Sequence, residues 1–262
     1  MSLIMTAAWW VQWKSGNSGW VDTIWSFGTG ATALASALVA TGEPWHWRQI
    51  LVAILVSCWS LRLGLHIATR TRAITNDPRY RRLIAQWGAR APRKMFWFLQ
   101  KQALASVPLV AAISLAAHNP DPSIRAVDVG ATVLLITALV GEAAADRQLR
   151  KFNRTHSGLA AVCDIGLWRY SRHPNYFFEW MAWVAYPLFA IDLAGYNPYG
   201  WLALLAPILM YWLLVHVSGI PLLEQHMLET RGEAFRAYQQ RAPAFFPCPT
   251  LMKAKDKSGY DV

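Results

Sequence analysis

The order of apolar and polar residues predicts a chain built from long hydrophobic helices. Six apolar stretches approach or exceed the roughly 18 residues that cross a bilayer as a helix. They lie near residues 19–40, 49–67, 96–117, 126–145, 176–194 and 201–219. A seventh stretch, residues 2–13, is short for a full span and fits a tilted, truncated or interfacial helix. The pattern therefore predicts an all-α, multi-pass membrane helix bundle with about seven transmembrane helices.

Two shorter segments have a different pattern. Residues 79–84 are rich in Arg and follow Asp77-Pro78, which predicts a short basic helix on the membrane surface. Residues 221–242 carry apolar side chains at three- and four-residue spacing, with Gly232 between them. This spacing predicts an amphipathic C-terminal helix that Gly232 divides. We expect one integral-membrane domain over residues 1–262, ending in a tail over residues 251–262.

Composition and charge support a membrane protein and give its orientation. The chain is 55% hydrophobic and only 15% charged, whereas a soluble domain carries about 25% charged residues. Of 25 Lys and Arg residues, 22 fall within residues 62–101, 147–172 and 231–257, which follow every second apolar stretch. The positive-inside rule then places these segments and the C-terminus in the cytoplasm, and the loops at 43–48, 118–125 and 193–200 outside. Topology thus explains most of the +10 net charge, and we expect no nucleic-acid partner.

Other composition features narrow the expected chemistry. Cys58, Cys163 and Cys248 form no C-x-x-C pair and no metal-ligand spacing, so we expect neither a disulfide nor a metal site. The chain is rich in Ala and Arg, which favours a bacterial protein of the inner membrane. Membrane lipids are expected partners, and no obligate protein partner is evident.

Ionisable residues inside apolar spans are costly and therefore suggest function. Asp22 and His66 lie in the apolar segments at residues 19–40 and 49–67, at ends that face the same side in this topology. Such a pair is suited to donating a proton to a substrate oxygen, with Asp22 holding the imidazole. The alternative is that Asp22 caps its helix and His66 marks an interface. Glu142 and Asp146, one helical turn apart, fit either an ion-pair cluster or the wall of a cofactor cleft.

The strongest local pattern runs from Ser171 to Glu179. Pro174 fits the first turn of a helix. The surrounding polar side chains are Arg172, His173, Asn175, Tyr176 and Glu179. A helix N-terminus attracts anions, Arg binds phosphate, and Asn and Glu bind amide or ribose groups. This chemistry suits a phosphorylated nucleotide cofactor entering from the cytoplasm, whereas an anionic-lipid site would explain only part of the set.

These residues also carry a family resemblance. The sequence Ser171-Arg172-His173-Pro174-Asn175-Tyr176-x-x-Glu179 resembles the signature of the steroid 5-alpha-reductase C-terminal superfamily, most closely its bacterial DUF1295 branch. The resemblance extends over most of the chain. The other stretches similar to that branch are Val21–Trp25, Leu61–His66, Asp77–Tyr80, Ala145–Leu149, Ser218–Glu224 and Arg231–Tyr238.

The resemblance implies a membrane reductase that takes NADPH from the cytoplasm and transfers hydride to an activated C=C bond. The substrate would be lipophilic, either steroid-like or another enone. Residues 1–125 would form the lipophilic pocket and residues 126–250 the cofactor-binding half. The residues implied in cofactor binding are Arg172, His173, Asn175, Tyr176 and Glu179 and, by weaker matches, Arg147, Arg150, Trp168, Glu224, Arg231 and Tyr238.

The chain departs from the family pattern on the substrate side. The early segments contain no Gln-Glu pair, and no Tyr lies near the cytoplasmic end of the segment at residues 49–67. Asp22 and His66 occupy roughly analogous places, so they either replace those groups or the substrate is not a 3-keto steroid. We expect His66, oriented by Asp22, to be the hydrogen-bond donor. No G-x-G-x-x-G pattern occurs, so no Rossmann domain is expected.

Two other functions fit parts of the sequence. Isoprenylcysteine and phospholipid methyltransferases, which use S-adenosylmethionine, are similar in the same C-terminal region. The basic cluster and the Asn-Tyr-x-x-Glu continuation favour the reductase over this alternative. A transporter or lipid-binding scaffold is the third class, but the polar residues cluster toward the cytoplasmic end and not at the midplane that transport sites occupy.

Overall fold

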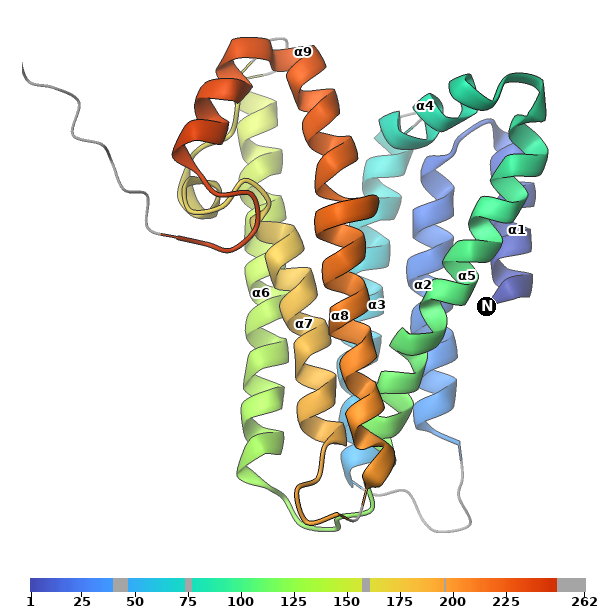
Figure 1. Ribbon diagram of the computed structural model, residues 1–262, viewed down its shortest axis with the longest axis vertical. Helices are drawn as coiled ribbons and strands as arrows, with labels where there is room; N and C mark the ends of the chain where they lie inside the picture. The colour runs from blue at the N-terminus through green and yellow to red at the C-terminus, as the bar shows by residue number, and fades with distance from the viewer. Residues whose placement is uncertain (40–46, 74–76, 157–160, 196, 249–262) are drawn as a thin grey trace, which may run out of the picture. The chain divides into compact units, whose positions relative to one another are not determined.

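The computed structural model describes residues 1–39, 47–73, 77–156, 161–195 and 197–248, and these form helices and no strand (Figure 1). The α-helices are α1 (Ser2–Ser15), α2 (Gly19–Ala37), α3 (Trp47–Ala73), α4 (Pro78–Trp87), α5 (Ala91–Ala117), α6 (Ala126–Thr155), α7 (Pro174–Ala190), α8 (Leu205–Trp212) and α9 (Ile220–Arg241). Shorter turns of other helix types are η1 (Gly88–Arg90), η2 (Gly166–Arg169), η3 (Pro198–Leu204) and η4 (Leu213–Val217). The all-α class is confirmed. The tail at 251–262 and part of the loop at 43–48 lie outside the described residues.

Four helical segments are long and apolar enough to cross a bilayer, judged by length and composition. They are Trp47–Arg72, Arg79–Ala117, Ala126–Thr155 and Pro198–Arg241. The membrane-helix character is therefore confirmed, while the count of about seven spans and the cytoplasmic C-terminus stay predictions. Helix α1 has 14 residues and so reaches about 21 Å at 1.5 Å per residue, less than the roughly 30 Å hydrocarbon core.

The last apolar stretch is not one regular helix. The chain passes from the 3-10 turn η3 through α8 to the π-helical turn η4 before α9 begins. Pro207 and Pro221 lack the N–H groups that a continuous α-helix would need, which favours this change of helix type. Within α9, Gly232 has φ 47° and ψ −121°, so the helix is broken at the residue expected to divide it.

The chain divides into two compact units, each made of two separate stretches. One unit contains Met1–Leu139 and Trp180–Leu213, and the other contains Val140–Glu179 and Leu214–Val262. Helices α6 and α7 pass from one unit into the other. The division therefore differs from the expected halves at residues 125 and 126. We call the two units the first unit and the second unit.

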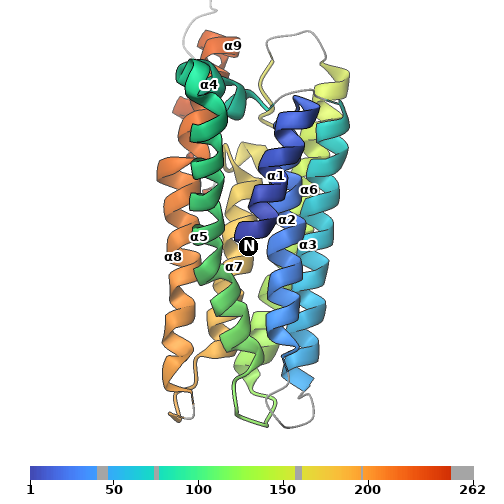
Figure 2. The same cartoon turned by 90° about the vertical axis from the view of Figure 1, so that its right-hand side faces the viewer.

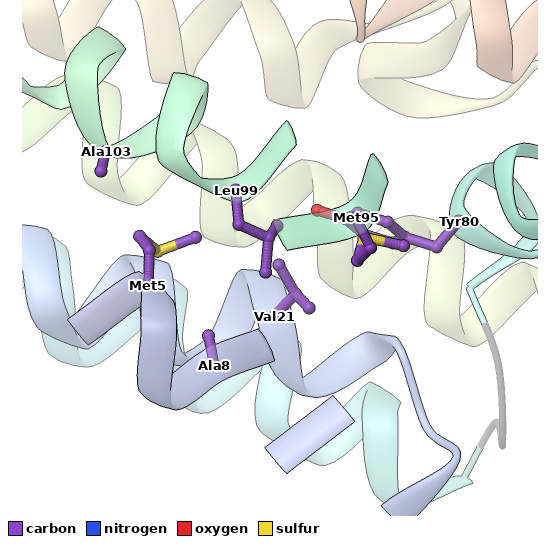
Figure 3. Packing of buried hydrophobic residues seen from close by; sticks show 7 residues of the cluster. All are labelled: Met5, Ala8, Val21, Tyr80, Met95, Leu99 and Ala103. Atoms are coloured by element: carbon purple, nitrogen blue, oxygen red, sulfur yellow. The ribbon is translucent and has the colours of Figure 1, made fainter. Parts of the chain in front are cut away.

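One hydrophobic cluster of the first unit lies between α1, α2, α4 and α5. Helix α1 packs on both α2 and α5 (Figure 2). The buried cluster between them consists of Met5, Ala8, Val21, Tyr80, Met95, Leu99 and Ala103 (Figure 3). Helices α2 and α3 approach closely, because a Cβ on Gly30 would lie 2.0 Å from Ser60 Oγ. Small residues at such crossings are typical of helix pairs in membranes.

A buried ion cluster lies at the end of the first unit where α3 and α6 begin. Arg48 is fully buried and donates to Asp128 at 2.9 Å. It also donates to the carbonyls of Asn119 at 3.1 Å and Ser123 at 2.9 Å. Arg125 binds the second oxygen of Asp128 at 2.6 Å. Arg48 and Asp128 are 80 residues apart, so no local sequence pattern indicated this pair.

Candidate functional site

The start of α7 is fixed by its own sequence. Pro174 is the first residue of α7, as predicted, where its missing N–H needs no partner. The backbone N–H of His173 donates to Ser171 Oγ at 3.1 Å. Ser171 Oγ in turn donates to the carbonyl of Phe245 at 2.8 Å. These bonds set the direction in which the side chains of the first turn leave the backbone.

The Glu224 carboxylate accepts hydrogen bonds from the polar side chains just before α7. Glu224, on α9, accepts through Oε1 from Arg172 Nε at 2.7 Å and from His173 Nε2 at 2.9 Å. Its Oε2 accepts from Gln239 Nε2 at 2.8 Å and from Arg172 Nη2 at 3.2 Å. The Arg172–Glu224 pair is therefore bidentate, a geometry that gives strong charge-assisted hydrogen bonds. Of these four residues, Arg172, His173 and Glu224 were expected from the sequence, and Gln239 was not.

Arg172 is occupied by groups of its own chain. Besides Glu224, its Nη1 donates to the carbonyls of Gln239 at 3.2 Å and Ala242 at 2.5 Å. Four of the five N–H groups of the guanidinium are thus directed at protein acceptors. The sequence suggested that Arg172 binds phosphate. The geometry instead favours a positioning role, in which Arg172 holds α9 against the loop before α7.

A short segment near the C-terminus completes this arrangement. The backbone N–H of Arg172 donates to the carbonyl of Pro243 at 2.9 Å, and the N–H of Cys248 donates to the carbonyl of Tyr170 at 3.0 Å. Together with the Ser171–Phe245 bond, these contacts fasten residues 242–248 to residues 170–172. We call residues 242–248 the C-terminal strap.

Two buried acceptor atoms at the start of α7 have no hydrogen-bond partner among the described residues. His173 is 3% exposed, and burial, with the Arg172 charge adding to it and Glu224 opposing it, lowers the pKa of His173 below its usual 6.5. The ring is therefore neutral at pH 7, donates from Nε2 and accepts at Nδ1. His173 Nδ1 and Asn175 Oδ1 are buried and have no hydrogen-bond partner within the described part of the chain. Asn175 Nδ2 donates to Asp146 at 3.3 Å, which fixes the amide orientation.

The aromatic residues predicted for cofactor binding contact the loop before α7. Trp168 donates from its indole to the carbonyl of Ala145 at 3.0 Å. Tyr238 donates to the carbonyls of Trp168 and, at 3.2 Å, of Ser171. Both side chains therefore hold the loop before α7. The ring of Tyr176 stacks on His173, with the centroids 5.5 Å apart.

Buried acids and exposed cations complete the predicted set. Glu142, Asp146 and Glu179 are all buried. Arg147 and Arg150 are exposed on α6, and Arg231 on α9 donates to Met227 Sδ at 3.4 Å. The second unit thus combines a buried polar cluster with exposed guanidinium groups.

Asp22 in the first unit has partners other than the one expected. Its Oδ1 accepts from the Tyr80 hydroxyl at 2.7 Å, and its Oδ2 is paired with Arg79. No hydrogen bond joins Asp22 to His66 in the residues that the structure describes. The expectation that Asp22 orients His66 is therefore replaced by an Asp22 that binds Arg79 and Tyr80. A guanidinium compensates the carboxylate charge, which a neutral imidazole does not. Asp22 therefore fastens α4 to α2, while His66 is half-buried on α3.

The start of α4 supports this fastening. Asp77 caps α4 by accepting from the backbone N–H of Arg79 at 2.9 Å, and it also accepts from Arg79 Nε at 3.0 Å. Burial by itself raises the pKa of Asp77, but the Arg79 hydrogen bonds and charge outweigh it, so the pKa lies below its usual 3.8. Tyr80 additionally accepts from Gln102 at 3.2 Å. The Asp77-Pro78 pattern predicted where α4 begins, whereas nothing in the local sequence showed that Arg79 and Tyr80 reach Asp22.

Comparison with known proteins gives a family. The family model described as "Protein of unknown function (DUF1295)" matches residues 8–242. No curated protein and no solved structure matches the chain. Since the matched region covers most of the 262 residues, the chain belongs to the DUF1295 family.

Proposed function

We propose that this protein is a membrane reductase that transfers hydride from NADPH to an activated C=C bond of a lipophilic enone. The observation that carries the proposal is the pair of buried acceptors at the start of α7, His173 Nδ1 just before the helix and Asn175 Oδ1 in its first turn. Buried polar groups normally find partners, so this pair fits a ligand that supplies N–H or O–H donors. The carboxamide and ribose groups of a nicotinamide nucleotide are such donors.

In this proposal the protein's side chains bind the nucleotide and align it. His173 and Asn175 accept from the ligand. Glu224 holds the His173 ring in place, while burial and the Arg172 charge keep that ring neutral. The N-terminus of α7, a helix of 17 residues, favours negative charge. Arg147 and Arg150 offer exposed guanidinium groups to phosphates. When bound, NADPH supplies the hydride.

On the substrate side, hydride addition builds negative charge on the carbonyl oxygen of an enone. A fixed hydrogen-bond donor at that oxygen lowers the barrier. His66 remains the proposed donor. The single hydroxyl proton of Tyr80 is already given to Asp22, so Tyr80 and Asp22 act in this proposal as positioning residues for α4.

S-adenosylmethionine is the competing cofactor, because its ribose hydroxyls and amine would also donate to His173 and Asn175. It carries no phosphate, so it would not engage the exposed guanidinium groups. The two functions therefore predict different ligands for the same acceptor pair.

Thermal unfolding of the purified full chain in detergent separates these ligands. A ligand at 100 times its Kd stabilises the protein by about 2.7 kcal/mol, so NADPH should raise the unfolding temperature by several degrees. Asn175→Ala should abolish the shift, while Asn153→Ala, an exposed control on α6, should retain it. A shift with S-adenosylmethionine and none with NADPH would establish the methyltransferase instead. If neither ligand shifts the transition, the proposed cofactor site is wrong.

A further inference from the structure

Positive charge is concentrated where α3 ends and α5 begins. Residues 62–101 contain ten Lys and Arg residues and one acid, Asp77. Asp77 is paired with Arg70 at 3.2 Å and Arg79 at 2.9 Å. Five exposed cations between residues 72 and 94 have no acidic partner among the residues described, namely Arg72, Arg81, Arg90, Arg93 and Lys94. They lie at the end of α3, on α4, on η1 and in the first turn of α5, all at one end of the first unit (Figure 1).

Exposed indoles lie directly beside part of this charge. Trp13 on α1 and Trp97 on α5 are 56% and 58% exposed. Trp9 connects the two helices, because its indole donates to the carbonyl of Pro92 at 2.9 Å and its ring contacts Phe96 with centroids 5.8 Å apart. Trp13 stacks on Trp9 at 6.0 Å. The end of α1 and the start of α5 therefore form one surface.

The same surface passes from charge to hydrocarbon along α5. Arg93 and Lys94 are exposed in the first turn, Trp97 follows one turn later and the exposed Lys101 one turn after that, and Leu104 and Val107 are exposed beyond them. One helical turn corresponds to about 5.4 Å, so cations, indole and aliphatic side chains succeed one another over a few turns. On α1, Lys14 lies 5.1 Å from the ring of Trp13. This order is typical of a bilayer interface, where Trp lies at the level of the headgroups.

We propose that the surface formed by Trp13, Lys14, Arg93, Lys94 and Trp97 binds the headgroup of an anionic phospholipid. Its phosphodiester oxygens accept from the guanidinium and ammonium groups, while the indoles lie beside the ester region and the acyl chains follow the exposed aliphatic face of α5. An acidic protein would use the cations but would not explain the indoles at the edge of an apolar face. This inference does not depend on the proposed reductase activity, because these residues belong to neither set of proposed reaction residues.

Native mass spectrometry of the full chain released from nanodiscs tests this proposal. With equal amounts of phosphatidylglycerol and phosphatidylcholine in the disc, we expect phosphatidylglycerol to be retained preferentially. Arg93→Gln/Lys94→Gln should weaken that retention by roughly fivefold for each charge removed. The matched control, Lys151→Gln/Arg154→Gln, removes two exposed cations near the C-terminal end of α6 and should change retention by less than twofold.

Three results would overturn the proposal. They are equal retention of the two lipids, equal losses in the two double variants, and unchanged retention in Arg93→Gln/Lys94→Gln. A further arm adds millimolar glycerol phosphate as a competitor without acyl chains. Failure to displace phosphatidylglycerol supports a lipid site, whereas full displacement would show a site for small phosphate anions and overturn the lipid assignment.

Discussion

The protonation of His173 is set by its surroundings. Burial lowers its pKa below 6.5, and Glu224 only partly opposes this. The neutral form leaves Nδ1 as an acceptor, which the proposed ligand contact requires. At the scale of single residues, the proposed ligand contact therefore depends on whether His173 is protonated.

This dependence predicts how stability changes with pH. A folded-state pKa below the unfolded value means that the contribution of His173 is complete above pH 6.5. As the pH falls below 6.5 the unfolded chain binds the proton first, so the free energy of unfolding should fall until the folded pKa is passed. The loss is about 1.4 kcal/mol for each unit of pKa difference. Unfolding temperatures measured from pH 8 to pH 5 should decline less steeply in His173→Gln than in the parent, and equal slopes would contradict the prediction.

A second residue-scale prediction separates His66 from Tyr80. His66→Gln should lower the rate of NADPH oxidation with a lipid-extract substrate by roughly 100-fold, since it removes the proposed donor. Tyr80→Phe should instead cost about 1–2 kcal/mol of stability, because the half-buried Gln102 amide and the Asp22 carboxylate each lose a hydrogen bond. Its turnover should stay within a few fold of the parent. The opposite pattern would make Tyr80 the donor.

At the scale of helices, Gly232 controls the shape of α9. Its φ of 47° and ψ of −121° suit glycine, and a Cβ there meets nothing within 4 Å. Gly232→Ala should therefore destabilise the protein by about 1–3 kcal/mol through backbone strain alone. Gly130→Ala on α6 is the matched control, because the added Cβ is equally unobstructed and its φ is not positive. Thermal unfolding should show a clear loss for Gly232→Ala and none for the control.

Helices were more predictable from the sequence than side-chain partners. The apolar stretches, Pro174 and Gly232 each act over a few residues, so local pattern predicted α2, α3, α5, α6, the start of α7 and the break in α9. The partners of Arg172 and Asp22 were not predictable in the same way. Arg172 meets Glu224 across 52 residues, and Arg79 meets Asp22 across 57. Long side chains choose partners by charge and reach in three dimensions, and periodicity carries no information about that choice.

At the scale of the whole molecule, cysteine labelling tests the proposed orientation. Cys248 is exposed and belongs to the end placed in the cytoplasm. A membrane-impermeant maleimide should modify it in inside-out vesicles and not in spheroplasts. Ile124, 70% exposed in the loop before α6, should show the reverse as Ile124→Cys in a Cys248→Ser background. Labelling of both positions from the same side would contradict the topology.

The C-terminal strap determines where the polypeptide can be shortened. A chain ending after residue 248 retains the bonds to Tyr170, Ser171 and Arg172, whereas one ending after residue 241 loses all three. We expect the first truncation to keep the NADPH-dependent rise in unfolding temperature and the second to lose it. Affinity tags and fusion partners for biochemical work therefore belong downstream of Cys248, since the residues just before it hold the loop that carries the proposed ligand contacts.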